Sequence, residues 1–165
     1  MKSLKFLFVA VLAAFTFVSC DQQPDQGLEH KGPIVLNWGD AADVNGKTFE
    51  IGMDNWSAET SELILHVELT NTLSDAKTFT LKEVRGYDLT TAFASVCTSQ
   101  CMPGNSQAEQ TWELGSVAAG DMMQVDLHLA PMVEAATTFP VEFTFSDGTD
   151  NVTFTVNYNY IPVAE

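Results

Sequence analysis

The sequence predicts an all-β fold, an antiparallel β-sandwich of about seven to nine strands. In several runs the apolar residues recur at every second position, which is the period of a sheet with one buried face. Short polar segments rich in turn-forming residues separate these runs. No segment keeps a helical period, and residues 132–137 could form one short turn at most.

Four runs alternate most clearly, and they occupy residues 63–69, 123–129, 141–145 and 152–160. The polar segment 146–151 joins the last two runs and predicts a hairpin, because its residues tolerate positive φ. Shorter runs at 34–38, 48–53, 77–85 and 110–114 complete the set. In residues 77–85 the apolar phase slips between Leu81 and Val84, which predicts a β-bulge.

The first 19 residues have the layout of a secretory signal. Lys2 and Lys5 form a basic start, and the apolar run that follows is too short to span a bilayer comfortably. The run ends in Phe17-Val18-Ser19-Cys20, which resembles the lipobox of bacterial lipoproteins. The resemblance implies cleavage before Cys20, diacylglycerol on its thiol and a third acyl chain, such as palmitate, on the new amino group. The alternative is an ordinary signal peptide in which Cys20 is incidental.

The predicted organisation is therefore a lipoprotein signal peptide at 1–19, a lipidated cysteine with its tether at 20–30, and a β-sandwich domain at 31–165. Residues 21–27 contain no apolar side chain and predict a flexible tether. Acidic residues directly behind a lipidated cysteine resemble the surface-export signals of Bacteroidetes lipoproteins, whereas an aspartate there implies inner-membrane retention in enterobacteria. We expect an outer-membrane protein, on the periplasmic face or at the surface, and leave the leaflet open.

Charge excludes two classes of partner. Without the signal peptide the chain has 5 basic and 22 acidic residues, a net charge of −17. Such a surface repels nucleic acid and anionic headgroups, so we expect no nucleic acid to bind and the membrane to be reached through the lipid alone. Solubility of an exposed domain explains this charge, and capture of a cation or a basic ligand is the alternative.

Two cysteines remain in an oxidising compartment, and their even number predicts a disulfide between Cys97 and Cys101. These cysteines are too close in sequence to bridge two sheets as in antibody domains, so the sandwich is Ig-like without the Ig cysteine signature. The alternative is copper: Cys-x3-Cys followed by Met102 offers soft ligands for Cu(I). It resembles the copper motif of Sco-type proteins, without their Cys-Pro and histidine context.

The order of the segments carries a further resemblance. A strand ending in VELTN precedes TFTLKEVR, CTSQC, LGSVAAGDMMQVDLHLAP and a final hairpin, VEFTFSDGTDNVTFTVNY. This order resembles the Ig-like domain of Bacteroidetes lipoproteins and surface proteins, including Omp28-related ones, over residues 60–160. The resemblance implies the fold and the compartment. The family's function is largely unassigned, so it implies no active-site residues.

Metal sites are weaker hypotheses, and we expect no bound cofactor. His66 and His128 fall on the outward face of neighbouring strands, where Glu68 and Asp126 could complete a Zn²⁺ or Cu²⁺ site. Two turns offer oxygens for Ca²⁺, and their residues are Asp147, Thr149 and Asp150 in one and Asp40, Asp43 and Asn45 in the other. The simpler interpretation is a hydrated sheet face and metal-free turns.

The sequence contains no Gly-x-Ser-x-Gly, no His-Glu-x-x-His and no phosphate-binding glycine loop. We therefore do not expect the protein to be an enzyme. We expect instead a non-catalytic binding or structural module that contacts an envelope or surface protein or a glycan; a periplasmic copper or zinc binder is the alternative. The longest irregular stretch, residues 87–110, is the predicted recognition loop, with candidate residues Phe93, Thr98, Ser99, Gln100 and Met102. Alternatively, Phe93 and Val96 pack over the open end of the core.

Overall fold

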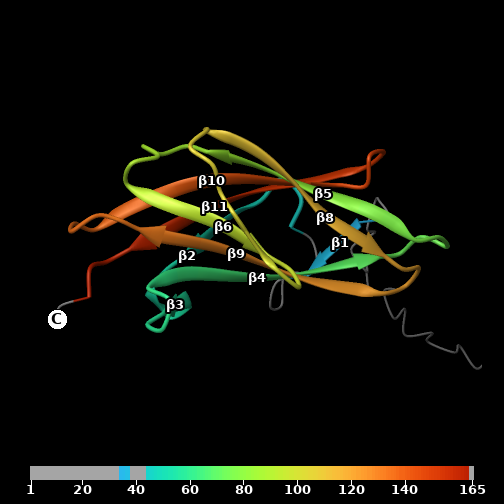
Figure 1. Ribbon diagram of the computed structural model, residues 1–165, viewed down its shortest axis with the longest axis horizontal. Coiled ribbons are helices and arrows are strands. Elements are labelled where there is room, and N and C mark those ends of the chain that lie inside the picture. Colours follow the sequence, from blue (N-terminus) through green and yellow to red (C-terminus); the bar gives the residue numbers. More distant parts are fainter. Residues whose placement is uncertain (1–33, 38–43, 164–165) are drawn as a thin grey trace, which may run out of the picture.

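A computed structural model describes residues 34–37 and 44–163, which form a sandwich of two β-sheets (Figure 1). The six-stranded sheet has the order β1-β4-β9-β6-β7, with β3 paired to β4. Its strands are β1 (Ile34–Asn37), β3 (Trp56–Ser57), β4 (Glu62–Asn71), β6 (Ala92–Cys97), β7 (Cys101–Pro103) and β9 (Met122–Pro131). The predicted leader, Cys20 and the tether lie outside the described residues.

The five-stranded sheet has the order β2-β11-β10-β5-β8. Its strands are β2 (Thr48–Ile51), β5 (Lys77–Arg85), β8 (Glu109–Val117), β10 (Thr137–Ser146) and β11 (Asn151–Tyr160), and the 3₁₀ turn η1 (Met53–Asn55) follows β2. The predicted all-β sandwich is confirmed. No helix in the described part of the chain is long and apolar enough to cross a membrane.

The alternating residues form the core, as the sequence period requires. In β4 the inward side chains Leu63, Leu65, Val67 and Leu69 are at most 2% exposed. From the other sheet, aromatic side chains of β10 and β11 fill the layer between the sheets; they are Phe139, Phe143, Phe145, Phe154 and Tyr158. Each such side chain contributes about 1.5–3 kcal/mol through burial, so the two sheets stabilise each other.

The N-terminal strands lie at the edges of the two sheets. β1 pairs antiparallel with β4, with Ile34 opposite Asn71. The chain then crosses to the other sheet, where β2 runs parallel to β11. β10 and β11 form the predicted hairpin, with Ser146 opposite Asn151.

Strand β5 differs from its prediction. The register between β5 and β8 shifts between Phe79 and Thr80, opposite Gly115, whose φ is 105°. The bulge predicted farther along β5 is wrong, because the strand keeps one phase and buries two charged side chains in it. These are Glu83 and Arg85, which are 2% and 6% exposed.

The predicted irregular stretch, residues 87–110, contains ordered strands between its turns. It contains β6, which pairs with β9, and β7, which pairs with β6. Strands β3, β6 and β7 bring the number of strands to eleven in the described residues, above the expected seven to nine. β3 and β7 are too short to show a period, and β6 consists of small and mixed residues.

Candidate functional site

The cysteine pair closes the β6–β7 hairpin. Cys97 and Cys101 face each other in register and form the predicted disulfide, with their Cα atoms 3.9 Å apart. The backbone N–H of Thr98 donates a hydrogen bond to the carbonyl oxygen of Gln100, 3.1 Å away. We call residues 97–101 the disulfide ring. Because both thiols are joined to each other, the thiolate ligands of the copper hypothesis are absent, and that prediction is wrong for this state of the chain.

The disulfide ring forms one wall of an open hollow of about 370 Å³. Thr98 and Ser99 line it together with the end of β8, the turn that follows β8, and the start of β9. Met122 and Met123 contribute apolar surface, and Met122 is 58% exposed. Asp121 adds a carboxylate. The hollow therefore combines adaptable thioether side chains with a polar rim, a mixture suited to binding another molecule.

The buried side chain of Asn71, at the end of β4, holds the β8–β9 turn, which also lines the hollow. Its amide group donates hydrogen bonds to the carbonyl oxygens of Val117 at 2.9 Å, Ala118 at 3.2 Å and Asp75 at 2.9 Å. Its backbone N–H donates to the carbonyl of Asp121, 3.0 Å away. One side chain thus joins the β4–β5 turn to the β8–β9 turn. The side chain of Asn71 has no solvent exposure, and its bond to Val117 is fully buried, so this bond does not compete with water.

A buried ion pair supports the segment that follows the ring. The guanidinium of Arg85 donates from Nε at 3.0 Å and from Nη2 at 2.8 Å to Glu83 Oε2. Its Nη1 donates to the carbonyl oxygens of Asn105 at 2.6 Å and Gln107 at 3.2 Å. Burial raises the pKa of Glu83, although the hydrogen bonds and the charge of Arg85 oppose this rise. The ion pair thereby holds residues 105–107 against β5, a role that sequence reasoning missed.

Gly104 begins this segment where only a glycine fits. A Cβ there would lie 2.5 Å from the carbonyl oxygen of Ala94 and 2.6 Å from Arg85 Nη2. The Gly104 N–H donates a hydrogen bond to that same carbonyl, 2.8 Å away. Next to it lies a smaller hollow of about 180 Å³, lined in part by Phe93 and Asn105.

The predicted recognition residues thus separate into groups. Thr98 and Ser99 line the larger hollow, and Phe93, 43% exposed, lines the smaller one. Gln100 is exposed on the disulfide ring, whereas Met102 is half-buried against the core. Val96 packs into the core as the alternative expected, but Phe93 points outward and does not cover it.

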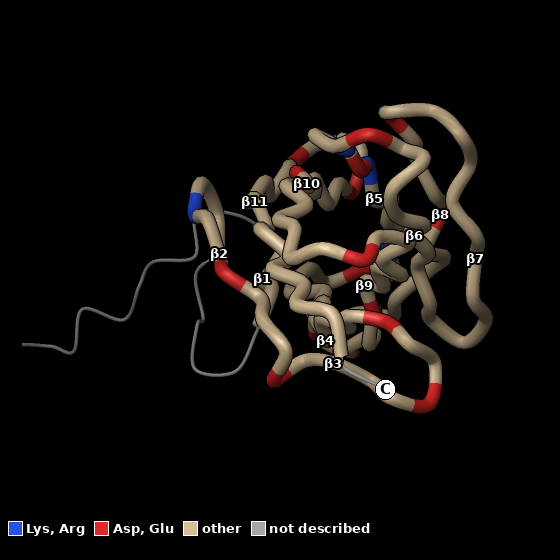
Figure 2. The backbone as a smooth tube through the Cα atoms, turned by 90° about the vertical axis from the view of Figure 1, so that its left-hand side faces the viewer, with Lys and Arg blue, Asp and Glu red and all other residues tan. Residues whose placement is uncertain are grey.

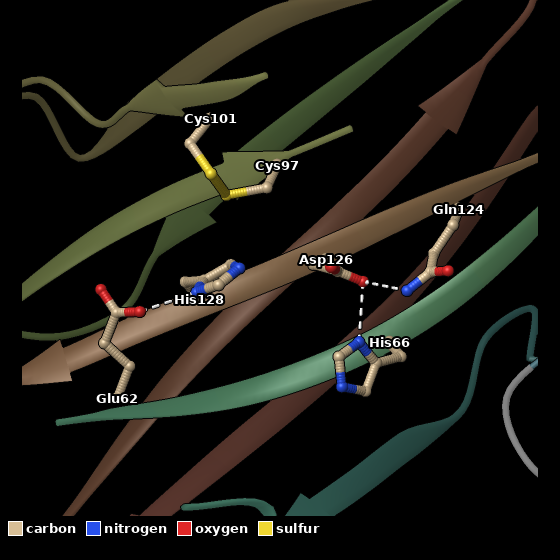
Figure 3. The surroundings of a disulfide bond; sticks show 7 residues. All are labelled: Glu62, His66, Cys97, Cys101, Gln124, Asp126 and His128. Atoms are coloured by element: carbon tan, nitrogen blue, oxygen red, sulfur yellow. Dashed lines mark hydrogen bonds and ion pairs between the residues drawn. A yellow bond between two sulfur atoms is a disulfide. The ribbon is translucent and has the colours of Figure 1, made fainter. Parts of the chain in front are cut away.

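The two histidines lie on neighbouring strands, as predicted, but each pairs with a different carboxylate (Figure 3). His66 Nδ1 lies 2.7 Å from Asp126 Oδ1, which also accepts a hydrogen bond from Gln124 at 3.0 Å. His128 Nδ1 lies 2.8 Å from Glu62 Oε2. Glu68 takes no part in either pair. The face carries two separate pairs and no shared site, so the zinc interpretation is not supported.

The calcium hypothesis also fails at the β10–β11 turn. Asp147 Oδ1 accepts backbone hydrogen bonds from Thr149 at 2.8 Å and Asp150 at 2.7 Å, so this carboxylate closes the turn itself. In the second turn, Asn45 Oδ1 accepts a hydrogen bond from the N–H of Thr153, and residues 40 and 43 lie outside the described part. Within the described residues, no group of three or more His, Cys, Asp and Glu side chains is arranged to hold a metal ion.

Among similar solved structures, one resembles this chain closely enough to support the fold. The N-terminal domain of PorA is 20% identical with a TM-score of 0.56, and the match covers 77% of this chain and 96% of that domain. A FixG-related protein from Vibrio parahaemolyticus is 12% identical with a TM-score of 0.42, covering 81% of this chain and 99% of that one. The PapD-like domain 7 of human CEP192 is 8% identical with a TM-score of 0.41, and the match covers 80% of this chain and 87% of that one.

No protein-family model matches the sequence, and a search of curated proteins finds no match. The likeness to the PorA domain therefore establishes the architecture and not the activity. The described chain is an Ig-like β-sandwich domain.

Proposed function

We propose that the protein is a lipid-anchored, non-catalytic recognition module of the bacterial envelope, which binds an envelope or surface protein or a glycan. The observation that carries the proposal is the hollow beside the disulfide ring. Two chain segments far apart in sequence build it, the disulfide ring and the β8–β9 hairpin, and hydrogen bonds of Asn71 hold the β8–β9 turn. A rigid scaffold that positions variable surface segments in this way is typical of binding sites.

The anchor is supported by the lipobox-like sequence ending at Cys20 and by the polar segment behind it. Several acyl chains on one residue give stable membrane attachment, whereas one chain gives only marginal binding. The acidic surface suits a domain exposed to solvent; Figure 2 shows acidic positions spread over the fold and few basic ones. Changing Cys20→Ala should abolish labelling with radioactive palmitate, and equal labelling of both proteins would contradict the anchor.

A non-catalytic role is supported by how the polar groups near the ring are used. The histidines are engaged by Glu62 and Asp126, and the buried carboxylate of Glu83 is engaged by Arg85. The hollow itself offers hydroxyl, amide and thioether groups with one carboxylate, Asp121. These groups can fix the orientation of a ligand but form no nucleophile–base pair.

Photo-crosslinking in living cells tests the proposed site. A photoreactive residue at Ser99 or at Met122 should crosslink to the same envelope component, identified by mass spectrometry. A photoreactive residue at Ala58, in the exposed turn before β4, is the matched control and should not crosslink to that component.

The variant Thr98→Gly/Ser99→Gly/Gln100→Gly keeps the disulfide and removes the side chains of the ring. It should lose the crosslink from Met122, whereas Ala58→Gly/Glu59→Gly/Thr60→Gly should retain it. Equal crosslinking from all three positions, or crosslinking that the ring variant leaves unchanged, would refute the site.

A further inference from the structure

Five of the described strands lie at the edges of the two sheets, since the two-residue β3 pairs with β4 beside β1, and one of the five differs from the rest. Among the described residues, β1 and β2 have four residues each and β7 has three, ending in Pro103. Short strands and proline are the usual protection of a sheet edge against pairing with other chains. β8 has nine residues and contains no lysine or proline. It is the longest edge strand of the described fold, and the register shift at Gly115 and the carboxylates of Glu109 and Glu113 are its interruptions.

The free side of β8 is unpaired. β5 is its hydrogen-bonded neighbour, and within the described part no other backbone hydrogen bond is formed along residues 110–116. Figure 2 shows β7 and β8 on the same side of the sandwich, away from β1 and β2. The far end of β8, through Leu114, Ser116 and Val117, lines the hollow beside the disulfide ring. An added strand would therefore run directly into that hollow.

The negative charge on the outward face of β8 favours a basic partner. Glu109 and Glu113 are exposed on the outward face, and only Glu109 has an ion pair, with Lys82 at 2.9 Å. A second copy of the chain is disfavoured, because antiparallel self-pairing centred on Glu113 sets like charges opposite each other. The net charge of −17 on each mature copy adds to this repulsion. A strand with basic outward side chains is complementary.

We propose that β8 binds an extended basic segment of a partner protein, which joins the five-stranded sheet as an additional strand. The backbone of the segment pairs with the free N–H and C=O groups of β8. Its basic side chains lie beside Glu113 on the outward face, and its apolar side chains cover the edge of the core next to Trp112 and Leu114. This inference rests on the proposed function, since it names the kind of partner that reaches the hollow.

The test uses the purified full chain and a defined probe, a fluorescent, acetylated ten-residue peptide of alternating lysine and valine. Valine favours strands, and the lysines supply the charge. Fluorescence anisotropy should show binding, and a peptide with glutamate in place of lysine should bind at least roughly tenfold more weakly. On the protein, Glu113→Lys should weaken binding roughly five- to tenfold. Glu142→Lys, an equal charge change on the enclosed strand β10 of the same sheet, should have little effect.

Backbone pairing is tested separately from charge. Successive residues of a strand direct their N–H groups to opposite sides, so only one phase of the peptide faces β8. A peptide N-methylated at all valines and a peptide N-methylated at all lysines should therefore differ in affinity. One of the two should bind roughly tenfold or more weakly than the unmethylated peptide, and the other should keep its affinity. Hydrogen exchange followed by NMR should show new protection at alternate amides of β8.

Three results would overturn the inference: no binding at millimolar peptide, equal loss in Glu113→Lys and Glu142→Lys, or equal binding of both methylated peptides. Failure here is distinguishable from failure of the proposed function. If the ring variant still loses its crosslink in cells while the peptide does not bind, only the added strand is refuted. If the peptide binds β8 but the ring variant keeps its crosslink, the recognition site is wrong and the β8 edge stands.

Discussion

Replacing Arg85 with methionine should destabilise the fold strongly and in a pH-dependent way. Methionine fills a similar space but leaves the Glu83 carboxylate, 2% exposed, without its partner. Removing one member of a buried ion pair costs about 3–5 kcal/mol, because an uncompensated charge remains inside. At pH 8, where the carboxylate is ionised in the unfolded chain, we expect this full loss of unfolding free energy.

The pH dependence follows from the pKa of Glu83. Burial raises it above its ordinary value of 4.5. Between the unfolded and the folded pKa, the native state binds more protons than the unfolded state, so the stability contributed by this group falls as pH rises. Without Arg85 the pKa of Glu83 in the folded state rises further, and the pH interval between its unfolded and folded pKa widens. At pH 4 the carboxyl is mostly protonated in both states, and the cost should shrink to about 2 kcal/mol, for the lost bonds to Asn105 and Gln107.

Urea denaturation followed by tryptophan fluorescence at pH 4, 6 and 8 measures these differences. The double variant Glu83→Leu/Arg85→Met is the control, and it should lie within about 2 kcal/mol of the unmodified protein with little pH dependence of its own. A cost of Arg85→Met that is the same at pH 4 and pH 8 would refute the reasoning. So would a double variant as unstable as the single one.

Three further predictions concern the site. Asn71→Ala should lower the free energy of unfolding by about 3 kcal/mol, because three carbonyl oxygens lose the same donor, and thermal unfolding measures this. Gly104→Ala should cost about 1–3 kcal/mol in urea, whereas Gly52→Ala, which has open space at its Cβ, should stay within about 0.5 kcal/mol; equal costs would contradict the close approach. Cys97→Ser/Cys101→Ser should lose at most about 2 kcal/mol, since the ring is small, and a larger loss would indicate that the disulfide also orders the surrounding sheet.

The long strands were predictable because their burial follows a single rule. In β4, β9, β10 and β11, apolar side chains take every inward position of the central part, and turn residues separate the strands. The outward placement of His66 and His128 on adjacent strands followed from the same alternation. The disulfide followed from composition alone, because two cysteines remained in an oxidising setting.

The rest depended on tertiary contacts that no local pattern encodes. Glu83 and Arg85 occupy inward positions of β5, and a reading based on hydrophobicity takes charged residues as outward. Only the pairing of the two with each other makes this burial tolerable. Likewise, the turn at Asp121 and the disulfide ring are far apart in sequence, and their common hollow arises from the fold. Sequence reasoning found the ring side chains but not Met122, whose exposure departs from the expected burial of methionine.

The place where the chain enters the sandwich bears on how the domain faces the bilayer. Ile34 pairs with Asn71, so the described chain begins at the end that carries the β8–β9 turn, while the C-terminal strand ends on the opposite side (Figure 1). If Cys20 is anchored, the 13 residues 21–33 span at most roughly 45 Å when extended. The tether then joins the domain at the end that carries the β8–β9 turn, which lines the hollow. For a partner in the same leaflet, the hollow would then be at the end of the domain nearest the anchor along the chain.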